Sequence, residues 1–328
     1  MIVSLAVALG LVTQDPSAGP PQQPPPPPFS AGDPTTLDEV VVERVGPREA
    51  ARTFVETVAA APRGARLARW AHPVCASVVG LRRPLAEAIL DRIAEVAAGL
   101  EVGVAGRRCT PNVVIIATDD GRAMAEAVVA RERERFRPQV GNSNLGLAAL
   151  DRFRTSETPV RWWHTSAPVF DDSDQLAARY RGGVAPGADA VARGGYASET
   201  AVRNVSRMRS GVRHVLNSVT VIVDLDRASG VPLPALADLI AMLAVAQIDP
   251  EADFSGVDTV LNLFDPAAGV AGLTAWDEDY LTALYAARPD RANSRLQEGE
   301  VTSELVRNRR QRGEIEVTDP SADDDPGS

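Results

Sequence analysis

The sequence contains no lysine, and all 34 of its positively charged side chains are arginine. Without lysine there is no G-x-x-x-x-G-K-[ST] loop, in which that side chain contacts the terminal phosphates of a nucleotide. The sequence also lacks the G-x-S-x-G elbow of serine hydrolases, and no G-x-G-x-x-G follows a predicted strand. These absences exclude the motif-bearing P-loop, serine-hydrolase and dinucleotide-binding families.

Histidine is scarce, with only His72, His164 and His214 in the chain. No two of them are two or four residues apart, which is the spacing that brings imidazoles together on a strand or a helix. We therefore expect no metal site and no other cofactor. The net charge of −10 also makes nucleic acid and anionic membrane surfaces poor partners for this chain.

The first 12 residues are a hydrophobic N-terminal segment that we interpret as a signal sequence. The apolar run "IVSLAVALGLV" at residues 2–12 has the length of a signal-peptide core and is too short to span a bilayer. It lacks the usual basic residues in front, and a buried N-terminal strand is the alternative. The interpretation predicts a periplasmic or secreted protein with no stable membrane span in the mature chain.

Residues 13–37 are predicted to be a disordered linker, because proline blocks both helix and sheet. Only two residues between Pro20 and Pro28 are not proline, which is typical of an extended polyproline spacer. A second disordered region is predicted at 291–328, where apolar residues are sparse and the end is acidic. Within that tail we expect at most one or two helical turns, around 302–311.

The chain has two cysteines, Cys75 and Cys109, each close to a predicted strand. In an exported protein an even number of cysteines favours a disulfide, and neighbouring strands would bring the two within range. Two reduced core thiols are the alternative for a cytosolic protein.

The hydrophobic pattern of residues 38–290 predicts a single α+β domain, a mixed sheet with packed helices in two or three layers. Helices and strands alternate in the first half, and a long glycine-rich loop is expected over 170–200. The predicted strands are 73–81, 112–118, 159–169 and 219–226. The predicted helices are 47–61, 84–100, 120–136, a short one within 140–153, 234–250 and 275–287.

The last part of this domain resembles the C-terminal half of the zincin metalloproteases, especially the astacin and matrixin types. The resemblance rests on the order of the strand "VTVIVDLD", the helix "LADLIAMLAVAQ", the turn "SGVDTVLNLF" and the helix "LTAWDEDYLTALY". More closely, it resembles uncharacterised alphaproteobacterial exported proteins that have a zincin-like arrangement without an intact metal motif. Thr274 is expected to cap the closing helix, with Asp277 three residues further on. An unrelated α+β domain with a buried helix would give a similar pattern.

The resemblance implies that the metal site has been lost. Zincins hold zinc with His-Glu-x-x-His-x-x-Gly-x-x-His on one helix, where the glutamate activates the metal-bound water. The corresponding positions here, including the methionine of the following turn, are Ala237, Asp238, Ala241, Ala244, Gln247 and Leu261. None of these side chains reproduces the histidine ligands, so the helix is expected to have become part of the core.

Two functions remain open from the sequence. The first is a non-catalytic binding or scaffolding protein of the cell envelope, with an envelope protein or a glycan as its partner. It rests on "RWWH": Trp162 and His164 share one face of the strand, and Arg161 and Trp163 share the other. One tryptophan is expected to be buried, and the other to offer a binding platform if it is exposed.

The alternative is a hydrolase with an unrecognised acid–base site. Its candidate catalytic residues are Asp224, Asp226, Asp238 and His164. The two aspartates Asp224 and Asp226 are expected on the same face of a strand. No helix-spaced pair of acids or glycine-flanked nucleophile supports this alternative.

Overall fold

A computed structural model describes residues 46–314 except for 107, 140, 173 and 178–205. The N-terminal segment 1–12, the proline-rich segment 13–37, most of the expected loop at 170–200 and the end of the acidic tail lie outside the described residues. The predictions made for those segments therefore stay predictions.

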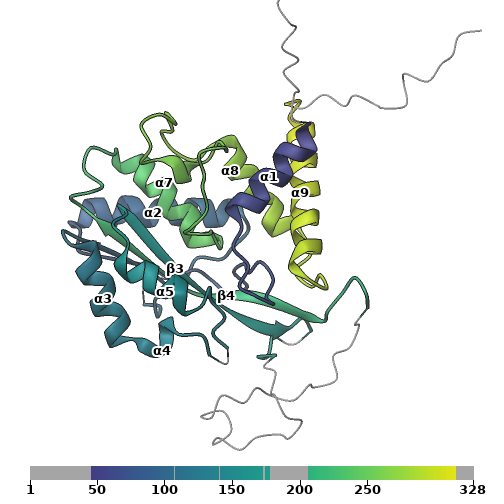
Figure 1. The fold of residues 1–328 in the computed structure, drawn as a ribbon, viewed down its shortest axis with the longest axis horizontal. Helices are drawn as coiled ribbons and strands as arrows, with labels where there is room; N and C mark the ends of the chain where they lie inside the picture. The colour runs from purple at the N-terminus through teal and green to yellow at the C-terminus, as the bar shows by residue number, and fades with distance from the viewer. Residues whose placement is uncertain (1–45, 107, 140, 173, 178–205, 315–328) are drawn as a thin grey trace, which may run out of the picture. The chain divides into compact units, whose positions relative to one another are not determined.

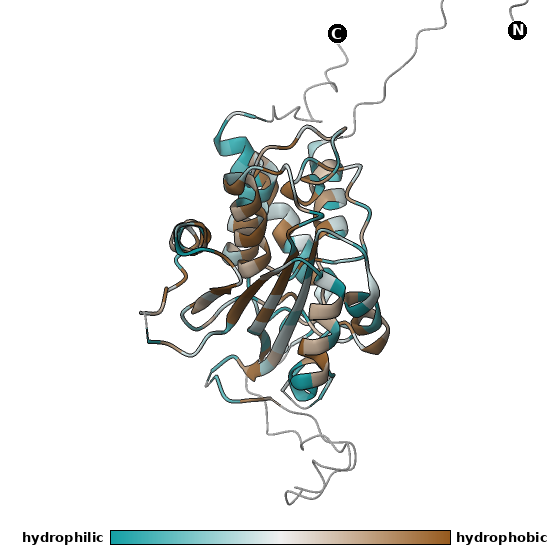
Figure 2. Ribbon diagram, turned by 90° about the vertical axis from the view of Figure 1, so that its left-hand side faces the viewer, coloured by the Kyte–Doolittle hydropathy of each residue, from teal (hydrophilic) through white to brown (hydrophobic). Residues whose placement is uncertain are grey.

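The centre of the fold is a four-stranded mixed sheet with the order β1-β2-β4-β3. Strands β1, β2 and β4 are parallel, and β3 is antiparallel to β4 at the edge of the sheet. Figure 2 shows that the central strands are apolar over most of their length. The expected mixed sheet with packed helices is thus confirmed. The strand bounds are β1 (Ala76–Val79), β2 (Val113–Thr118), β3 (Val160–Phe170) and β4 (Val212–Asp224).

Helices cover both faces of the sheet, which gives three layers. On one face α2 and α7 pack together, and on the other lie α3, α4 and α5 (Figure 1). The bounds of these helices are α2 (Arg83–Gly99), α3 (Gly121–Arg131), α4 (Arg133–Phe136), α5 (Leu147–Thr155) and α7 (Leu233–Val245). The other helices in the described residues are α1 (Pro47–Val58), the short 3-10 helix η1 (Val260–Asn262), α8 (Ala275–Ala286) and α9 (Ser294–Gln311).

Strand β4 begins at Val212, seven residues before the predicted start at Val219. The missed part, "VRHVLNS", is mixed in polarity and carries no continuous apolar pattern. It becomes a strand because it pairs with the second half of β3, from Ser166 to Phe170, beyond a register shift at Thr165/Ser166. The partner strand, and not the local sequence, specifies this segment.

Helix α9 occupies part of the tail that we expected to be disordered. Its apolar residues are few, but Val301, Leu305 and Val306 are all buried. Polar contacts also hold α9 against the domain. The buried Gln297 side chain accepts a hydrogen bond from Leu67 N at 2.8 Å and donates one to Leu67 O at 3.0 Å. Figure 1 shows α9 beside α1, and α9 also packs on α8. The expectation of a disordered region was therefore wrong for this segment.

Cys75 and Cys109 form the expected disulfide, with their Cα atoms 6.1 Å apart. Cys75 directly precedes β1, and Cys109 lies in the connection from α2 to β2. The bond therefore ties that connection to the first strand of the sheet. Among the described helices, none is both long and apolar enough to cross a membrane.

We expect removal of this disulfide by Cys75→Ala with Cys109→Ser to lower the free energy of unfolding by about 3–4 kcal/mol. The bond closes a loop with a sequence separation of 34, and without it the unfolded chain regains conformational entropy worth about this much. Urea unfolding of the oxidised wild type, the reduced wild type and the variant measures it. The last two should agree, and a loss below about 1 kcal/mol would contradict the prediction.

Candidate functional site

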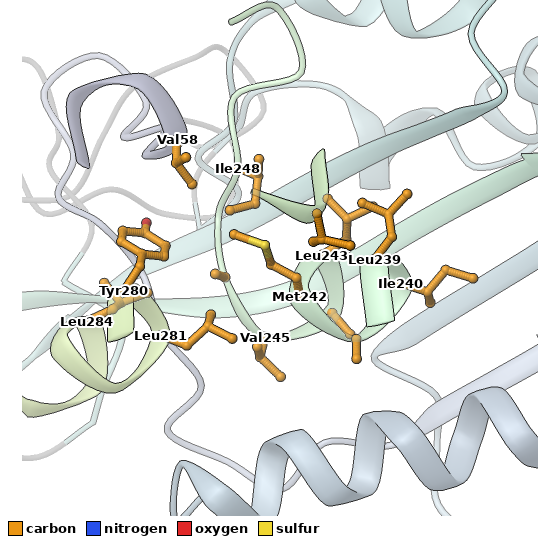
Figure 3. Packing of buried hydrophobic residues seen from close by; sticks show 14 of the residues in the cluster. Val58, Leu239, Ile240, Met242, Leu243, Val245, Ile248, Tyr280, Leu281 and Leu284 are labelled. Atoms are coloured by element: carbon orange, nitrogen blue, oxygen red, sulfur yellow. The ribbon is translucent and has the colours of Figure 1, made fainter. Parts of the chain in front are cut away.

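Helix α7, for which the sequence suggests a likeness to the zincin metal helix, is buried on every side. All residues from Ala235 to Val245 except Asp238 are less than a tenth exposed. Figure 3 shows its large side chains, among them Leu239, Met242 and Leu243, in one buried cluster with residues from other elements such as Ile248 and Leu281. The helix therefore forms the centre of the core, as its sequence predicts.

The positions that hold the metal motif in zincins have structural roles here. Ala237, Ala241 and Ala244 are buried. The side-chain oxygen of Gln247 accepts a hydrogen bond from Ala68 N at 2.9 Å. Asp238 forms an ion pair with Arg92 of α2 and accepts a hydrogen bond from Leu273 N at 3.0 Å. Among the described residues, no three His, Cys, Asp or Glu side chains gather closely enough to hold a metal ion.

His164 is one of three side chains that donate hydrogen bonds to the carbonyl groups at the C-terminal end of α7. The last carbonyl groups of a helix have no partner within it. Here His164 Nε2 donates to Leu243 O at 2.7 Å, Trp70 Nε1 donates to Ala244 O at 2.7 Å, and Tyr285 Oη donates to Val245 O at 2.8 Å. Burial lowers the pKa of His164 to about 4, partly offset by its bond to Leu243, so the imidazole is neutral at physiological pH. Its geometry is that of a structural cap.

The other candidate acid–base residues lie in separate environments. Asp224, the last residue of β4, is 1% exposed, while Asp226 lies beyond the strand in an exposed turn. The expectation that both share a face of the strand does not hold, because β4 ends between them. Asp238 is engaged by Arg92, as described above. The structure therefore brings none of these acids into a common pair.

Asp224 is the centre of a buried charge cluster at the carboxyl ends of β2 and β4. Its carboxylate accepts hydrogen bonds from Gly121 N at 3.1 Å, Arg227 N at 3.1 Å and Arg227 Nη1 at 3.0 Å. Burial alone would raise the pKa of Asp224, but the hydrogen bonds from Arg227 and Gly121 and the charge of Arg227 bring it below its usual value. A Cβ on Gly121 would lie 3.1 Å from Asp224 and 3.2 Å from Arg161 Nη2, so a glycine suits this start of α3.

Arg161 lies beside this cluster and is only 3% exposed. Its Nη1 donates to Phe153 O at 3.3 Å, whereas Nε and Nη2 have no hydrogen-bond partner among the described residues. The negative charge of Asp224 is the largest favourable influence on this desolvated guanidinium. The predicted binding residue Arg161 is thus buried next to Asp224, one of the candidate acid–base residues.

The two tryptophans of β3 point to opposite faces of the sheet, as predicted. Trp163 is buried with Phe136 and Phe153 on the side of α3 and α5. Trp162 faces α7, donates from Nε1 to Ile248 O at 3.0 Å and is only partly buried. Trp162 is therefore the tryptophan with a ring surface available to a ligand.

The first half of β3 has an unpaired backbone edge. Asp224 N donates to Pro159 O at 2.9 Å, so in the antiparallel register the peptide groups of Arg161, Trp163 and Thr165 also face β4. Those of Val160, Trp162 and His164 face outward, and within the described part of the chain they form no hydrogen bond. Further along, the outer edge is covered: Ser166 bonds Ser143 in both directions, and Pro168 O accepts from Ala177 N.

A groove of about 610 Å³ runs beside this open edge. Its floor is the segment from Thr158 to Trp162, one wall is α5, and the other wall is formed by Leu239 of α7 and the chain between Pro250 and Phe264. Apolar and aromatic side chains dominate the lining; those of Phe153, Trp162, Leu239, Phe254, Leu261 and Phe264 are the largest. A groove with an apolar lining and a free strand edge suits an extended polypeptide.

Of the residues that line the groove, the sequence predicts Arg161 and Trp162 as binding residues but not the others. Phe254, Leu261 and Phe264 lie in the loop after α7, where an apolar side chain has no periodic pattern that would assign it to a surface. The sequence pattern predicts Phe153 and Leu239 as ordinary core residues of their helices. A scan against protein-family models, a search of curated proteins and a search of solved structures each found no match to this chain.

Proposed function

We propose that this protein binds an extended polypeptide segment, which adds to β3 as a further strand and inserts apolar side chains into the groove. The observation that carries the proposal is that Val160 and Trp162, whose outward-facing backbone groups have no hydrogen-bond partner among the described residues, line the apolar groove. Unpaired edges are hazards that proteins normally cover, as this one does further along β3. An edge left open beside an apolar groove is the arrangement used in peptide recognition by strand addition.

The proposal includes binding without hydrolysis. Positions of α7 that would hold a zincin metal are occupied by buried alanines. Asp224 and Asp238 are engaged in separate structural contacts, and Asp226 lies in an exposed turn. We further propose that the fold is a degenerate relative of the zincins whose binding groove persisted after the metal ligands were lost. The disulfide supports an exported location, periplasmic or secreted, so the partner is proposed to be a segment of an envelope protein.

A peptide is favoured over a glycan because the edge of β3 presents backbone hydrogen-bonding groups. Sugars are commonly held by stacking on an exposed aromatic ring with side-chain hydrogen bonds around it. Here the indole N–H of Trp162 is already used by Ile248 O, and the neighbouring groups are backbone amides and carbonyls in strand geometry. Amides and carbonyls spaced along a strand are complementary to those of a second extended polypeptide.

The test uses the heptapeptide Ac-Thr-Leu-Thr-Leu-Thr-Leu-Thr-amide and two N-methylated forms, one methylated on the leucines and one on the inner threonines. A strand beside β3 directs only alternate amides toward it. One methylation pattern should therefore weaken binding at least about tenfold, and the other should have little effect, because about two hydrogen bonds are lost in one case only. Calorimetry measures affinity, and hydrogen exchange should show protection of the Val160 and Trp162 amides.

A matched pair of protein variants localises the binding. Leu261→Arg places a charge in the groove, whereas Leu147→Arg changes a leucine of α5 that is 63% exposed and does not line the groove. We expect the first to abolish measurable peptide binding and the second to leave it unchanged. Equal weakening by both methylation patterns, or equal effects of both variants, would contradict strand addition in this groove.

A further inference from the structure

An ion pair crosses the groove on its solvent side. Arg152 projects from α5 and Glu251 from the loop after α7, so the two residues belong to opposite walls of the groove and are 99 positions apart in sequence. Their side chains are 54% and 38% exposed, respectively, which places the pair at the mouth, while the edge of β3 forms the floor. The pair joins the two walls directly in front of the space that a ligand strand would occupy.

The pair is easily opened. Ion pairs between exposed side chains contribute little to stability, because water solvates both ions well when they separate. A strand added to β3 would lie about 4.8 Å from it, between the two walls. Its entry separates Arg152 from Glu251 and leaves one positive charge on the α5 wall and one negative charge on the loop wall.

The side chains of an extended ligand alternate between these two walls. The loop wall carries most of the bulky apolar lining, with Leu239, Phe254, Leu261 and Phe264, so it takes the apolar face of the ligand. A basic residue on that same apolar face would meet Glu251. An acidic residue at a neighbouring position, on the opposite face of the strand, would meet Arg152.

We infer that the groove selects an extended segment that carries a basic residue on its apolar face and an acidic residue on its other face, at adjacent or other odd spacing. Such a ligand exchanges the single Arg152–Glu251 pair for two pairs across the interface. A segment with the two charges exchanged places like charges opposite each other. This inference rests on the proposed function, because it assigns charge specificity to the same groove.

The experiment compares two isomeric peptides, Ac-Thr-Leu-Glu-Lys-Thr-Leu-Thr-amide and Ac-Thr-Leu-Lys-Glu-Thr-Leu-Thr-amide. They differ only in the order of the third and fourth residues, so composition, net charge and strand propensity are the same. The first has lysine on the leucine face and glutamate on the threonine face. We expect the wild type to bind it about five- to thirty-fold more tightly, the range given by two weak favourable pairs against two unfavourable ones. The preference should decrease at high salt.

The variant Arg152→Glu with Glu251→Arg reverses the two walls and keeps an ion pair across the mouth. It should fold as the wild type does and prefer the second peptide by a similar factor. If both proteins bind both isomers equally, the charge selection is wrong while strand addition stands. If neither isomer nor the neutral peptide binds, the proposed function itself is wrong. A preference that does not reverse in the variant would also overturn the inference.

Discussion

The variant Asp224→Ala is expected to lose about 2–4 kcal/mol of the free energy of unfolding. The substitution leaves the N–H groups of Gly121 and Arg227 without their acceptor, and it removes the carboxylate beside the buried guanidinium of Arg161. A buried charge that has lost its counter-charge is among the costly defects in a protein. Arg227 itself is 42% exposed and can return to water, which keeps the expected loss below that of a fully buried pair.

Asp224→Asn is the matched control, because its side-chain oxygen can still accept a hydrogen bond while the charge is gone. We expect it to lose about half as much free energy of unfolding as the alanine variant. The pKa of Asp224 lies below its usual value, so the carboxylate stabilises the fold above the ordinary aspartate pKa of about 3.9. That contribution is lost as the pH falls through the lower pKa of the folded state.

Urea unfolding at several pH values measures these differences. The gap between wild type and Asp224→Ala should be widest near neutral pH and should shrink as the pH is lowered below about 4. A catalytic or ligand-binding aspartate kept at the expense of stability would behave differently, since its removal would leave stability unchanged or raise it. That outcome would contradict the structural role assigned to Asp224 and would favour the alternative of a hydrolase with an acid–base site.

The sequence predicted the elements whose local pattern is strong. The apolar run of α7, the alternation around Trp162 and Trp163, and the cap at the start of α8 all follow from a few neighbouring residues. At that cap Thr274 Oγ1 accepts a hydrogen bond from Asp277 N at 3.2 Å, and Asp277 Oδ2 accepts one from Thr274 N at 2.9 Å. Local hydrogen bonds of this kind are encoded within one turn of the chain.

The elements that were missed depend on partners far along the chain. Helix α9 is held by Gln297 against Leu67, 230 residues away in sequence, and by Arg309 and Arg312 against the buried carboxylate of Asp279. The local sequence does not indicate such distant partners, so the composition of the segment alone predicts a disordered tail. The groove could not be predicted for the same reason. Its two walls come from α5 and from the loop after α7, and only the folded sheet brings them together.

The second large effect is expected when histidines are placed at the two positions of α7 that correspond to zincin metal ligands in the proposed relationship. The double variant Ala237→His with Ala241→His should lose about 2–6 kcal/mol of the free energy of unfolding. Ala237 is 3% exposed and Ala241 is fully buried, so each imidazole must enter a space shaped for a methyl group. Overpacking costs about 1–3 kcal/mol per site, and buried ring nitrogens without partners add to it.

The matched control places the same pair on an exposed face of a helix. Arg122 and Glu126 of α3 are also one turn apart, and their side chains are 54% and 46% exposed. Arg122→His with Glu126→His should change the free energy of unfolding by less than about 1 kcal/mol, because neither ring is buried. The comparison separates the cost of two histidines one turn apart on a helix from the cost of burying them in α7.

Zinc binding distinguishes a closed core from an open cleft. We expect the α7 variant to bind no zinc in a one-to-one ratio by calorimetry and elemental analysis, and to hydrolyse no protein substrate when zinc is added. A third ligand is also missing, because the side-chain oxygen of Gln247 is committed to Ala68 N at 2.9 Å. If the variant instead kept its full stability and bound zinc tightly, the alanine face of α7 would be an open site. The buried-core explanation of this helix, and with it the proposal of binding without hydrolysis, would then be wrong.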